Sequence, residues 1–184
     1  MGGIFASSSV ILFGVQTMQS DTKQNIVTWI LWFVMDVILA VTSYVGEKKK
    51  SVVERRRVNV PWLPIGFTAG AFFMVVALVL KGTWQFGLVE IVSVAGITIA
   101  LFVWMKVGPT ASVVVSVVAS IVAGIPAVYT AIISPAPETG WFWGACAFSG
   151  ILTFAATEKW TIEQRLFPIS TFFLNLGMAA LMIR

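Results

Sequence analysis

Hydrophobic and polar positions follow one another along this chain in long blocks. Stretches of mostly apolar residues are separated by short breaks rich in polar residues, glycine or proline. A helix needs about 20 predominantly apolar residues, within a range of roughly 17–25, to cross a bilayer. The blocks therefore predict seven spanning helices, of which the first and sixth are the shortest. They cover residues 3–19, 25–46, 60–80, 85–106, 110–133, 141–157 and 162–183.

Composition points to the same class of protein. Hydrophobic residues make up 58% of the 184 residues, charged residues only 11%, and the mean hydropathy is +0.93. A soluble domain is about 45–50% apolar and about 25% charged, so this chain could not cover a water-facing surface. We therefore expect an all-α integral membrane protein.

Several kinds of chemistry are excluded by the residues that the chain lacks. It has no histidine and a single cysteine, Cys146. Imidazole catalysis, an internal disulfide and metal ligation by cysteine and histidine are therefore excluded. The few acidic residues lie mostly in predicted loops, and no two share one predicted helix core. We expect no enzyme activity, no cofactor and no metal site.

Lysine and arginine are distributed unequally between the two ends of the predicted helices. With the segment at 47–57 in the cytoplasm, the positive-inside rule places the N-terminus inside and the C-terminus outside. We expect the inner (plasma) membrane of a bacterium, and we attribute the net charge of +4 to topology. Binding of anionic lipid headgroups is the other reading of the basic segment. The basic residues inside are Lys48, Lys49, Lys50, Arg55, Arg56, Arg57, Lys106, Lys159 and Arg165, against Lys23, Lys81 and Arg184 outside.

The chain also matches itself at two offsets. One shift superimposes the ends of two short helices and the tryptophan-rich starts of the helices that follow, and a second shift superimposes two later helices. The pairs are Ile11/Ile125, Ser20/Ser134, Trp29/Trp143 and Ile38/Leu152 for the first, and Pro64/Pro168 and Met74/Met178 for the second.

This internal similarity predicts two three-helix repeats, residues 1–80 and 109–184, within a single membrane domain of residues 1–184. The linker helix lies within residues 81–108. Because one helix separates the repeats, both enter the membrane in the same orientation, as parallel repeats related by an axis along the membrane normal. The expected fold is seven transmembrane helices as two three-helix bundles joined by a linker helix (3+1+3).

Two segments resemble a known superfamily. Pro126, within Gly124-Ile125-Pro126-Ala127-Val128-Tyr129, matches the proline typical of the first helix of a repeat in SWEET and PQ-loop proteins. Trp29, Trp32 and Asp36 resemble the Trp-x-x-Trp-x-x-x-Asn stripe of Pnu-type vitamin transporters, with Asp in place of Asn. With the 3+1+3 plan, the chain resembles this superfamily of small-solute transporters. The resemblance implies a small neutral or weakly charged solute between the two bundles, without carrying over the vitamin specificity.

Asp36 is the acidic residue closest to the middle of a predicted helix. An ionisable group at bilayer depth costs at least ~2.5–3.5 kcal/mol to insert, so it normally faces a bundle interior or a cavity. Asn25, Trp29, Trp32 and Ser43 recur near helical spacing and share its face. Two indoles and a carboxyl suit stacking on a sugar ring or holding a cation. Without a lysine or arginine at that depth the empty site favours the protonated carboxyl; the alternative is a structural hydrogen bond to a neighbouring helix.

Five other residues are candidates for the same site. Asn175, near the middle of the seventh helix, matches a polar pocket position of SWEET-like transporters, and Trp143 is the repeat partner of Trp29. Glu90, near the outer end of the fourth helix, is a candidate for proton or cation coupling, with snorkelling to the interface as the alternative. Pro126 and Tyr129 are candidate gating residues.

Small residues recur every four positions on three predicted helices. Such stripes let helix backbones approach closely in membranes, so we interpret them as packing faces. They are Ser112, Ser116, Ser120 and Gly124, then Gly66 and Gly70, and finally Gly96 and Ala100.

These patterns favour a small-solute transporter or facilitator. Asp36, Trp29, Trp32, Trp143 and Asn175 would line a midplane cavity, and rocking of the two bundles would give alternating access. The competing hypothesis is an accessory or structural membrane subunit without transport activity. The partners that we expect are a small polar or cationic solute and membrane lipid, without nucleic acid, and a homo-oligomer is left open.

Overall fold

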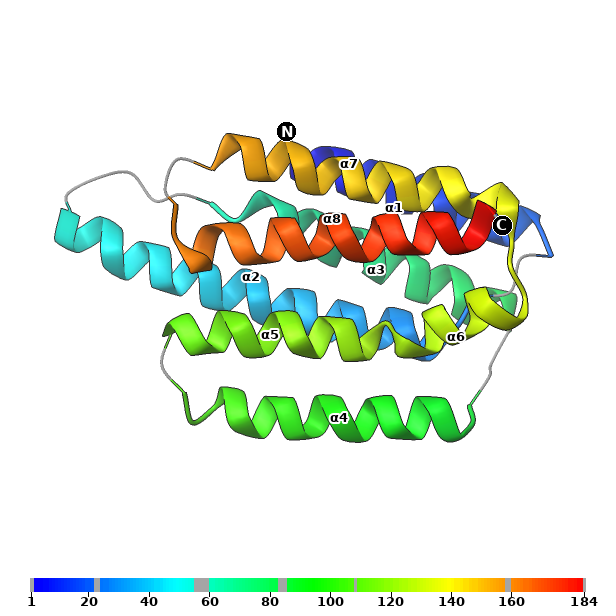
Figure 1. The fold of residues 1–184 in the computed structure, drawn as a ribbon, viewed down its shortest axis with the longest axis horizontal. Coiled ribbons are helices and arrows are strands. Elements are labelled where there is room, and N and C mark those ends of the chain that lie inside the picture. The colour runs from blue at the N-terminus through cyan, green and yellow to red at the C-terminus, as the bar shows by residue number, and fades with distance from the viewer. Residues whose placement is uncertain are drawn as a thin grey trace.

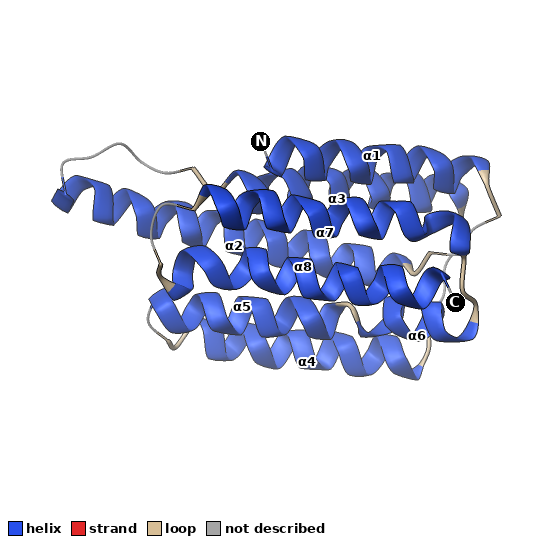
Figure 2. Ribbon diagram, turned by 45° about the horizontal axis from the view of Figure 1, so that its top comes forward, coloured by secondary structure: helices blue, strands red, loops and turns tan. Residues whose placement is uncertain are grey.

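A computed structural model describes residues 2–21, 24–54, 60–82, 86–107, 109–157 and 160–183. Each of the predicted apolar blocks is helical, and the described residues contain helices and connecting segments only (Figures 1 and 2). The elements are α1 (Gly2–Gln19), α2 (Ile26–Glu54), α3 (Trp62–Lys81), α4 (Leu88–Trp104), α5 (Pro109–Ala123), α6 (Ile125–Ile133), the short 3-10 helix η1 (Pro137–Thr139), α7 (Gly140–Ala156) and α8 (Ile162–Ile183).

The end of α2 differs from the prediction. We expected the helix to stop at residue 46 and the basic segment 47–57 to be a loop, but α2 continues to Glu54. Hydropathy marks where a helix leaves the apolar layer, whereas the residues that follow contain no glycine or proline and include glutamate and lysine, which are good helix formers. The rest of the basic segment, residues 55–59, and the basic residues at 23, 159 and 184 lie outside the described residues.

The predicted helix at 110–133 is divided in two. α5 ends at Ala123 and α6 begins at Ile125. Pro126 has no N–H to donate to the carbonyl four residues earlier, so a continuous ladder is interrupted there. The Gly124 N–H instead donates to the carbonyls of Ser120 and Ile121, at 3.2 and 3.0 Å. The break therefore lies at the segment that the sequence had singled out.

Four helical segments are long and apolar enough to cross a membrane, and α4 is a shorter apolar helix. The outward faces agree with this, since Leu12, Phe72, Phe102 and Phe173 are exposed. Large apolar side chains on several outer faces suit a lipid environment. The chain is thus consistent with an integral membrane protein. The four spans are Ile26–Lys48, Trp62–Lys81, Val113–Ile133 and Gln164–Ile183.

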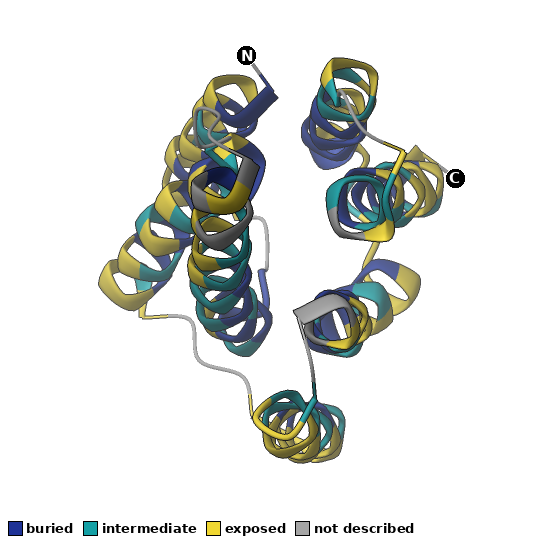
Figure 3. Cartoon of the chain, turned by 90° about the vertical axis from the view of Figure 1, so that its left-hand side faces the viewer, coloured by how far each residue is buried: buried dark blue, intermediate teal, exposed yellow. Residues whose placement is uncertain are grey.

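The helices lie side by side along one direction. α1 packs on α3 and α3 on α2, while α7 packs on α8 and α8 on α5. Seen end-on, these form two facing rows that touch where α1 meets α7 and where α2 meets α5 (Figure 3). α4 packs on α5 and α6 and, to a small extent, on α2, so it lies at the edge of the molecule (Figure 1).

The contact between α1 and α3 depends on glycine. A Cβ at Gly66 would meet the backbone of Gly3, and a Cβ at Gly70 would lie 2.5 Å from the Cβ of Val10. The stripe that the sequence predicted as a packing face therefore brings these two backbones together. Gly96 of α4 likewise faces Val122 of α5.

Candidate functional site

A cavity of about 60 Å³ lies between the two rows of helices. Six helices contribute to its wall: α1, α2, α3, α5, α7 and α8. Because the rows meet at their outer edges, through α1–α7 and α2–α5, this space is left in the middle of the molecule. We call it the central cavity.

The five residues predicted to bind a solute all line the central cavity. Trp29, Trp32 and Asp36 come from successive turns of α2, Trp143 from α7 and Asn175 from α8. Spacings of three and four residues place the three α2 side chains on one face of that helix. The structure thus brings together side chains from three elements that are far apart in the sequence.

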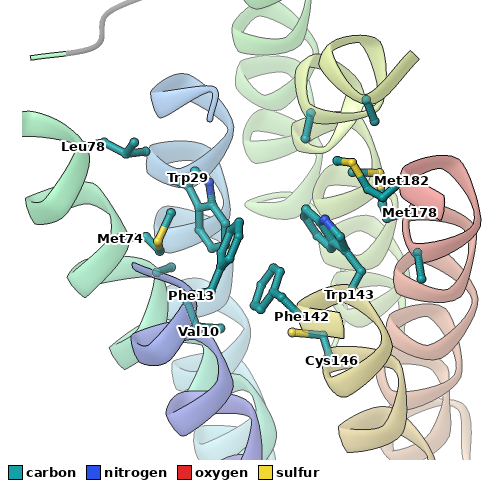
Figure 4. Close-up of a cluster of buried hydrophobic side chains, with 14 of the residues drawn as sticks. Val10, Phe13, Trp29, Met74, Leu78, Phe142, Trp143, Cys146, Met178 and Met182 are labelled. Carbon is teal, nitrogen blue, oxygen red and sulfur yellow. The ribbon is translucent and has the colours of Figure 1, made fainter. Parts of the chain in front are cut away.

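Aromatic rings form one wall of the cavity. Trp29 and Trp32 pack edge to face at 5.3 Å between ring centroids, and Trp32 lies 6.0 Å from Trp143. Phe13 of α1 stacks on Phe142 of α7 at 4.0 Å. These five residues, which we call the aromatic cluster, join the first two helices to α7. Figure 4 labels Phe13, Trp29, Phe142 and Trp143.

Some polar groups of the cavity have hydrogen-bond partners in the protein and others have none. The Trp32 indole donates to the Ser120 carbonyl at 2.9 Å, and the Asn175 amide nitrogen donates to the Thr171 carbonyl at 2.7 Å. Asp36 is 8% exposed, and no described residue donates a hydrogen bond to its carboxyl or pairs with it. The buried Trp143 indole nitrogen also lacks a partner among the described residues. The cavity therefore keeps a free carboxyl.

A second, larger cavity of about 220 Å³ lies at the end of the molecule where α2 leads into α3. Gly2 and Gly3 at the start of α1, Thr42, Ser43 and Glu47 near the end of α2, and Gln164 at the start of α8 contribute to it. We call this space the vestibule. It is the more polar of the two cavities.

An apolar layer separates the vestibule from the central cavity. It consists of Ala6, Leu39, Leu63, Val117 and Phe167, with Phe67 packed against it. The Phe167 side chain lines both cavities and meets Phe67 edge to face at 6.4 Å between ring centroids. Along α2 the order is Asp36 in the cavity, Leu39 in the layer and Ser43 in the vestibule. On α5 about one turn divides the two spaces, from Val117 to Val113, whereas on α8 Phe167 lines both.

The opposite end of the molecule is packed more extensively. Beyond the aromatic cluster lie the buried side chains of Met74, Leu78, Met178 and Met182 (Figure 4). A further contact joins the two rows there: the Trp141 indole donates to Gln16 at 2.9 Å, and the Gln16 amide donates to the Glu138 carbonyl at 3.2 Å. A small pocket of about 10 Å³ at this end shares Trp143 with the central cavity, so the aromatic cluster is the barrier on this side.

Glu90 lies outside the central cavity. It occupies the first turn of α4, where one carboxylate oxygen accepts the Gly87 N–H at 2.7 Å and the other accepts the Asn25 amide at 2.6 Å. The Asn25 side-chain oxygen in turn accepts the N–H groups of Val27 and Thr28 at the start of α2. Glu90 and Asn25 thus hold the starts of α4 and α2 together, and proton or cation coupling by Glu90 stays a prediction.

The two candidate gating residues are in different environments. Pro126 is buried in the first turn of α6, directly after the break at Gly124. Tyr129 points outward and is about half exposed. Ser43, which shares a face with Asp36, lies in the vestibule, one layer away from the cavity.

Sequence reasoning did not identify Phe167, Thr171 or Cys146 as lining residues of the central cavity. A signal for the first two was present, because they precede Asn175 by two turns and one turn of the same helix. Cys146 lies one turn after Trp143 in the same way. Extending the helical period from each predicted residue would have found all three.

No family model matches the chain, and no curated protein or solved structure is significantly similar to it. What the chain does must therefore be argued from the geometry of its cavities and the side chains in them.

Proposed function

We propose that the protein is a small-solute membrane transporter or facilitator whose site is the central cavity. The observation that carries this proposal is the convergence of Asp36, Trp29, Trp32, Trp143 and Asn175 on one cavity. A polar group buried at membrane depth normally serves a site or a contact between helices. A structural role is less favoured for Asp36, since no described residue uses its carboxyl.

The proposal includes seven transmembrane helices arranged as 3+1+3. The contacts between helices support it: α1 packs on α3 and α3 on α2 in one half, and α5 packs on α8 and α8 on α7 in the other. These two sets correspond under the repeat that pairs Trp29 with Trp143 and Pro64 with Pro168. The peripheral place of α4 is what a linker helix requires.

The unequal barriers at the two ends support alternating access. One apolar layer separates the central cavity from the vestibule, whereas the aromatic cluster and the residues beyond it close the other end. Rocking of the two rows would thin one barrier while it thickens the other. The break at Gly124 and Pro126 supplies a point where α5 and α6 can change their relative angle.

The single cysteine offers a direct test. Cys146 lines the central cavity and is 1% exposed, so a membrane-impermeant methanethiosulfonate can modify it only when the cavity opens. In a transporter the cavity opens to each face in turn, so we expect modification both in right-side-out and in inside-out vesicles. The readout is the mass of the intact chain against time.

Two control variants, each made in the Cys146→Ala protein, identify the membrane face that is exposed to the reagent and the level of non-specific labelling. Val53→Cys, on the exposed part of α2 beyond the apolar span, should react from one face only and reports the orientation. Leu12→Cys, on an outward apolar face, should stay unmodified. If Cys146 reacts from one face only, alternating access is wrong. If it reacts from neither, the accessory-subunit hypothesis takes precedence.

A further inference from the structure

We propose that the solute of the central cavity is a small organic monocation of the ammonium or guanidinium type. This inference rests on the proposed transport function and specifies the chemical class of its substrate. Charge, ring geometry, hydrogen-bonding capacity and volume each point to this class.

Charge is the first argument. Asp36 contributes a carboxyl, and no lysine or arginine belongs to the described lining of the central cavity. A carboxylate without a partner is costly in a low-dielectric interior, and a cationic solute offsets that cost. The described lining of the central cavity offers an anionic solute no cationic side chain.

The aromatic wall is the second argument. Indole is the best of the protein side chains at attracting a cation within about 6 Å of its ring centroid. Three indoles line this cavity, and Trp32 is nearly perpendicular to Trp29, at 89°, and tilted by 71° to Trp143. Rings at such angles surround a compact cation from different sides. They do not form the flat slot of parallel rings that would stack on a sugar or a nucleobase.

The remaining polar groups act mainly as acceptors. One N–H of the Asn175 amide is bonded to the Thr171 carbonyl, so the amide oxygen and the second N–H have no partner among the described residues. With the Asp36 carboxylate, that oxygen suits a ligand that carries several N–H donors. The unpartnered Trp143 N–H adds a neutral donor but no positive charge.

The volume sets the size of the solute. At about 60 Å³ the central cavity is less than half of the roughly 150 Å³ that accommodates one benzene molecule in an engineered protein cavity. A solute of a few heavy atoms therefore fits, whereas a sugar or a vitamin requires the cavity to expand.

Guanidinium and urea make a matched pair for the test, since they share a planar shape and the same number of heavy atoms and differ in charge. The full chain in detergent micelles is treated with a neutral thiol reagent, and the rate at which Cys146 is modified is followed with each probe added. Guanidinium should slow the reaction in proportion to occupancy, by about tenfold at about ten times its Kd, because only the unoccupied site reacts. Urea at the same concentration should leave the rate unchanged.

Two carboxyl-to-amide variants show whether the protection depends on the proposed site. Asp36→Asn keeps the size of the side chain but removes its charge, so protection by guanidinium should be lost. Asp21→Asn makes the same chemical change at an exposed site outside the cavity and should keep full protection. A second measurement, the Tm in guanidinium minus the Tm in urea at millimolar concentration, should be positive for the wild type and close to zero for Asp36→Asn.

The outcomes separate this inference from the proposed function. Equal protection by urea and guanidinium, or protection that survives Asp36→Asn, would overturn the cation class. Modification of Cys146 from both faces of vesicles without guanidinium protection would also overturn it, while the transporter proposal would stand. Absence of modification from either face contradicts the transporter itself, and the Tm comparison then decides whether a cation binds.

Discussion

At the scale of single residues, α2 carries two buried polar side chains that differ in their hydrogen bonding. Asn25 uses both ends of its amide, accepting from the N–H groups that begin α2 and donating to Glu90. The carboxyl of Asp36, further along the same helix, has no hydrogen-bond partner among the described residues. A satisfied polar group stabilises a fold, whereas an unsatisfied one is retained for function at some cost in stability.

Replacement of Asn25 should therefore destabilise the protein. Asn25→Ala removes a helix N-cap, which is worth about 0.5–2 kcal/mol, and leaves the buried Glu90 carboxylate short of one donor. We expect a loss of about 2–3 kcal/mol in the free energy of unfolding, measured by thermal unfolding in detergent micelles. Asp21→Asn, at an exposed site, is the control and should unfold like the wild type. Wild-type stability of Asn25→Ala would show that the contact between α2 and α4 contributes little.

Asp36→Asn should have the opposite effect on stability. The substitution replaces an ionisable residue, whose insertion at bilayer depth costs about 2.5–3.5 kcal/mol, and gives up no partner in the described structure. We expect the Tm of the variant to equal or exceed that of the wild type while guanidinium protection is lost. A clear drop in Tm would instead identify Asp36 as a structural residue.

At the scale of helices, the close approach of α1 and α3 depends on the absence of a side chain at Gly66. A Cβ there meets the backbone of Gly3, which cannot move aside as a flexible side chain would. Gly66→Ala should cost about 1–3 kcal/mol through overpacking, measured by the same unfolding assay. Gly144→Ala on α7 is the matched control, because nothing lies within 4 Å of its Cβ position. Equal stability of the two variants would contradict the packing face.

The break between α5 and α6 is the other feature at this scale. It is held from outside the helix by Trp32, whose indole donates to the Ser120 carbonyl, and a Cβ at Gly124 would lie 3.1 Å from the Trp32 ring. A side chain of the cavity wall thus touches the one interrupted helix. A solute that displaces Trp32 would therefore change the contacts of this side chain with Ser120 and Gly124 at the break.

At the scale of the whole molecule, four layers follow one another along the helices: the vestibule, the apolar layer, the central cavity and the aromatic cluster. The apolar layer is the barrier on the vestibule side, and Phe167 spans it. Truncation of this side chain should connect the two cavities.

We expect Phe167→Ala to raise the rate of Cys146 modification from the vestibule end by about tenfold or more, since every 1.4 kcal/mol removed from an opening equilibrium is tenfold. The rate from the opposite face should stay within about twofold, because the aromatic cluster is untouched. The measurement is the vesicle labelling described above, compared between the two orientations. Leu166→Ala, beside the layer on the same helix and not in the wall of either cavity, is the control. An equal increase from both faces would place the barrier elsewhere.

Hydropathy alone determined the helices and the membrane class, because the thickness of a bilayer requires apolar segments of a set length whatever their neighbours. Helical spacing also placed Trp29, Trp32 and Asp36 on one face of α2. Only the tertiary structure decided which other helices meet that face. Phe167 and Thr171 share a helical face with Asn175, and Cys146 shares one with Trp143, but only the pairing of the two rows turns these faces toward α2, and no local pattern encodes such pairing. In the same way Glu90, a coupling candidate in the sequence, proved to bind Asn25, a residue far away in the chain whose position depends on how α2 and α4 pack.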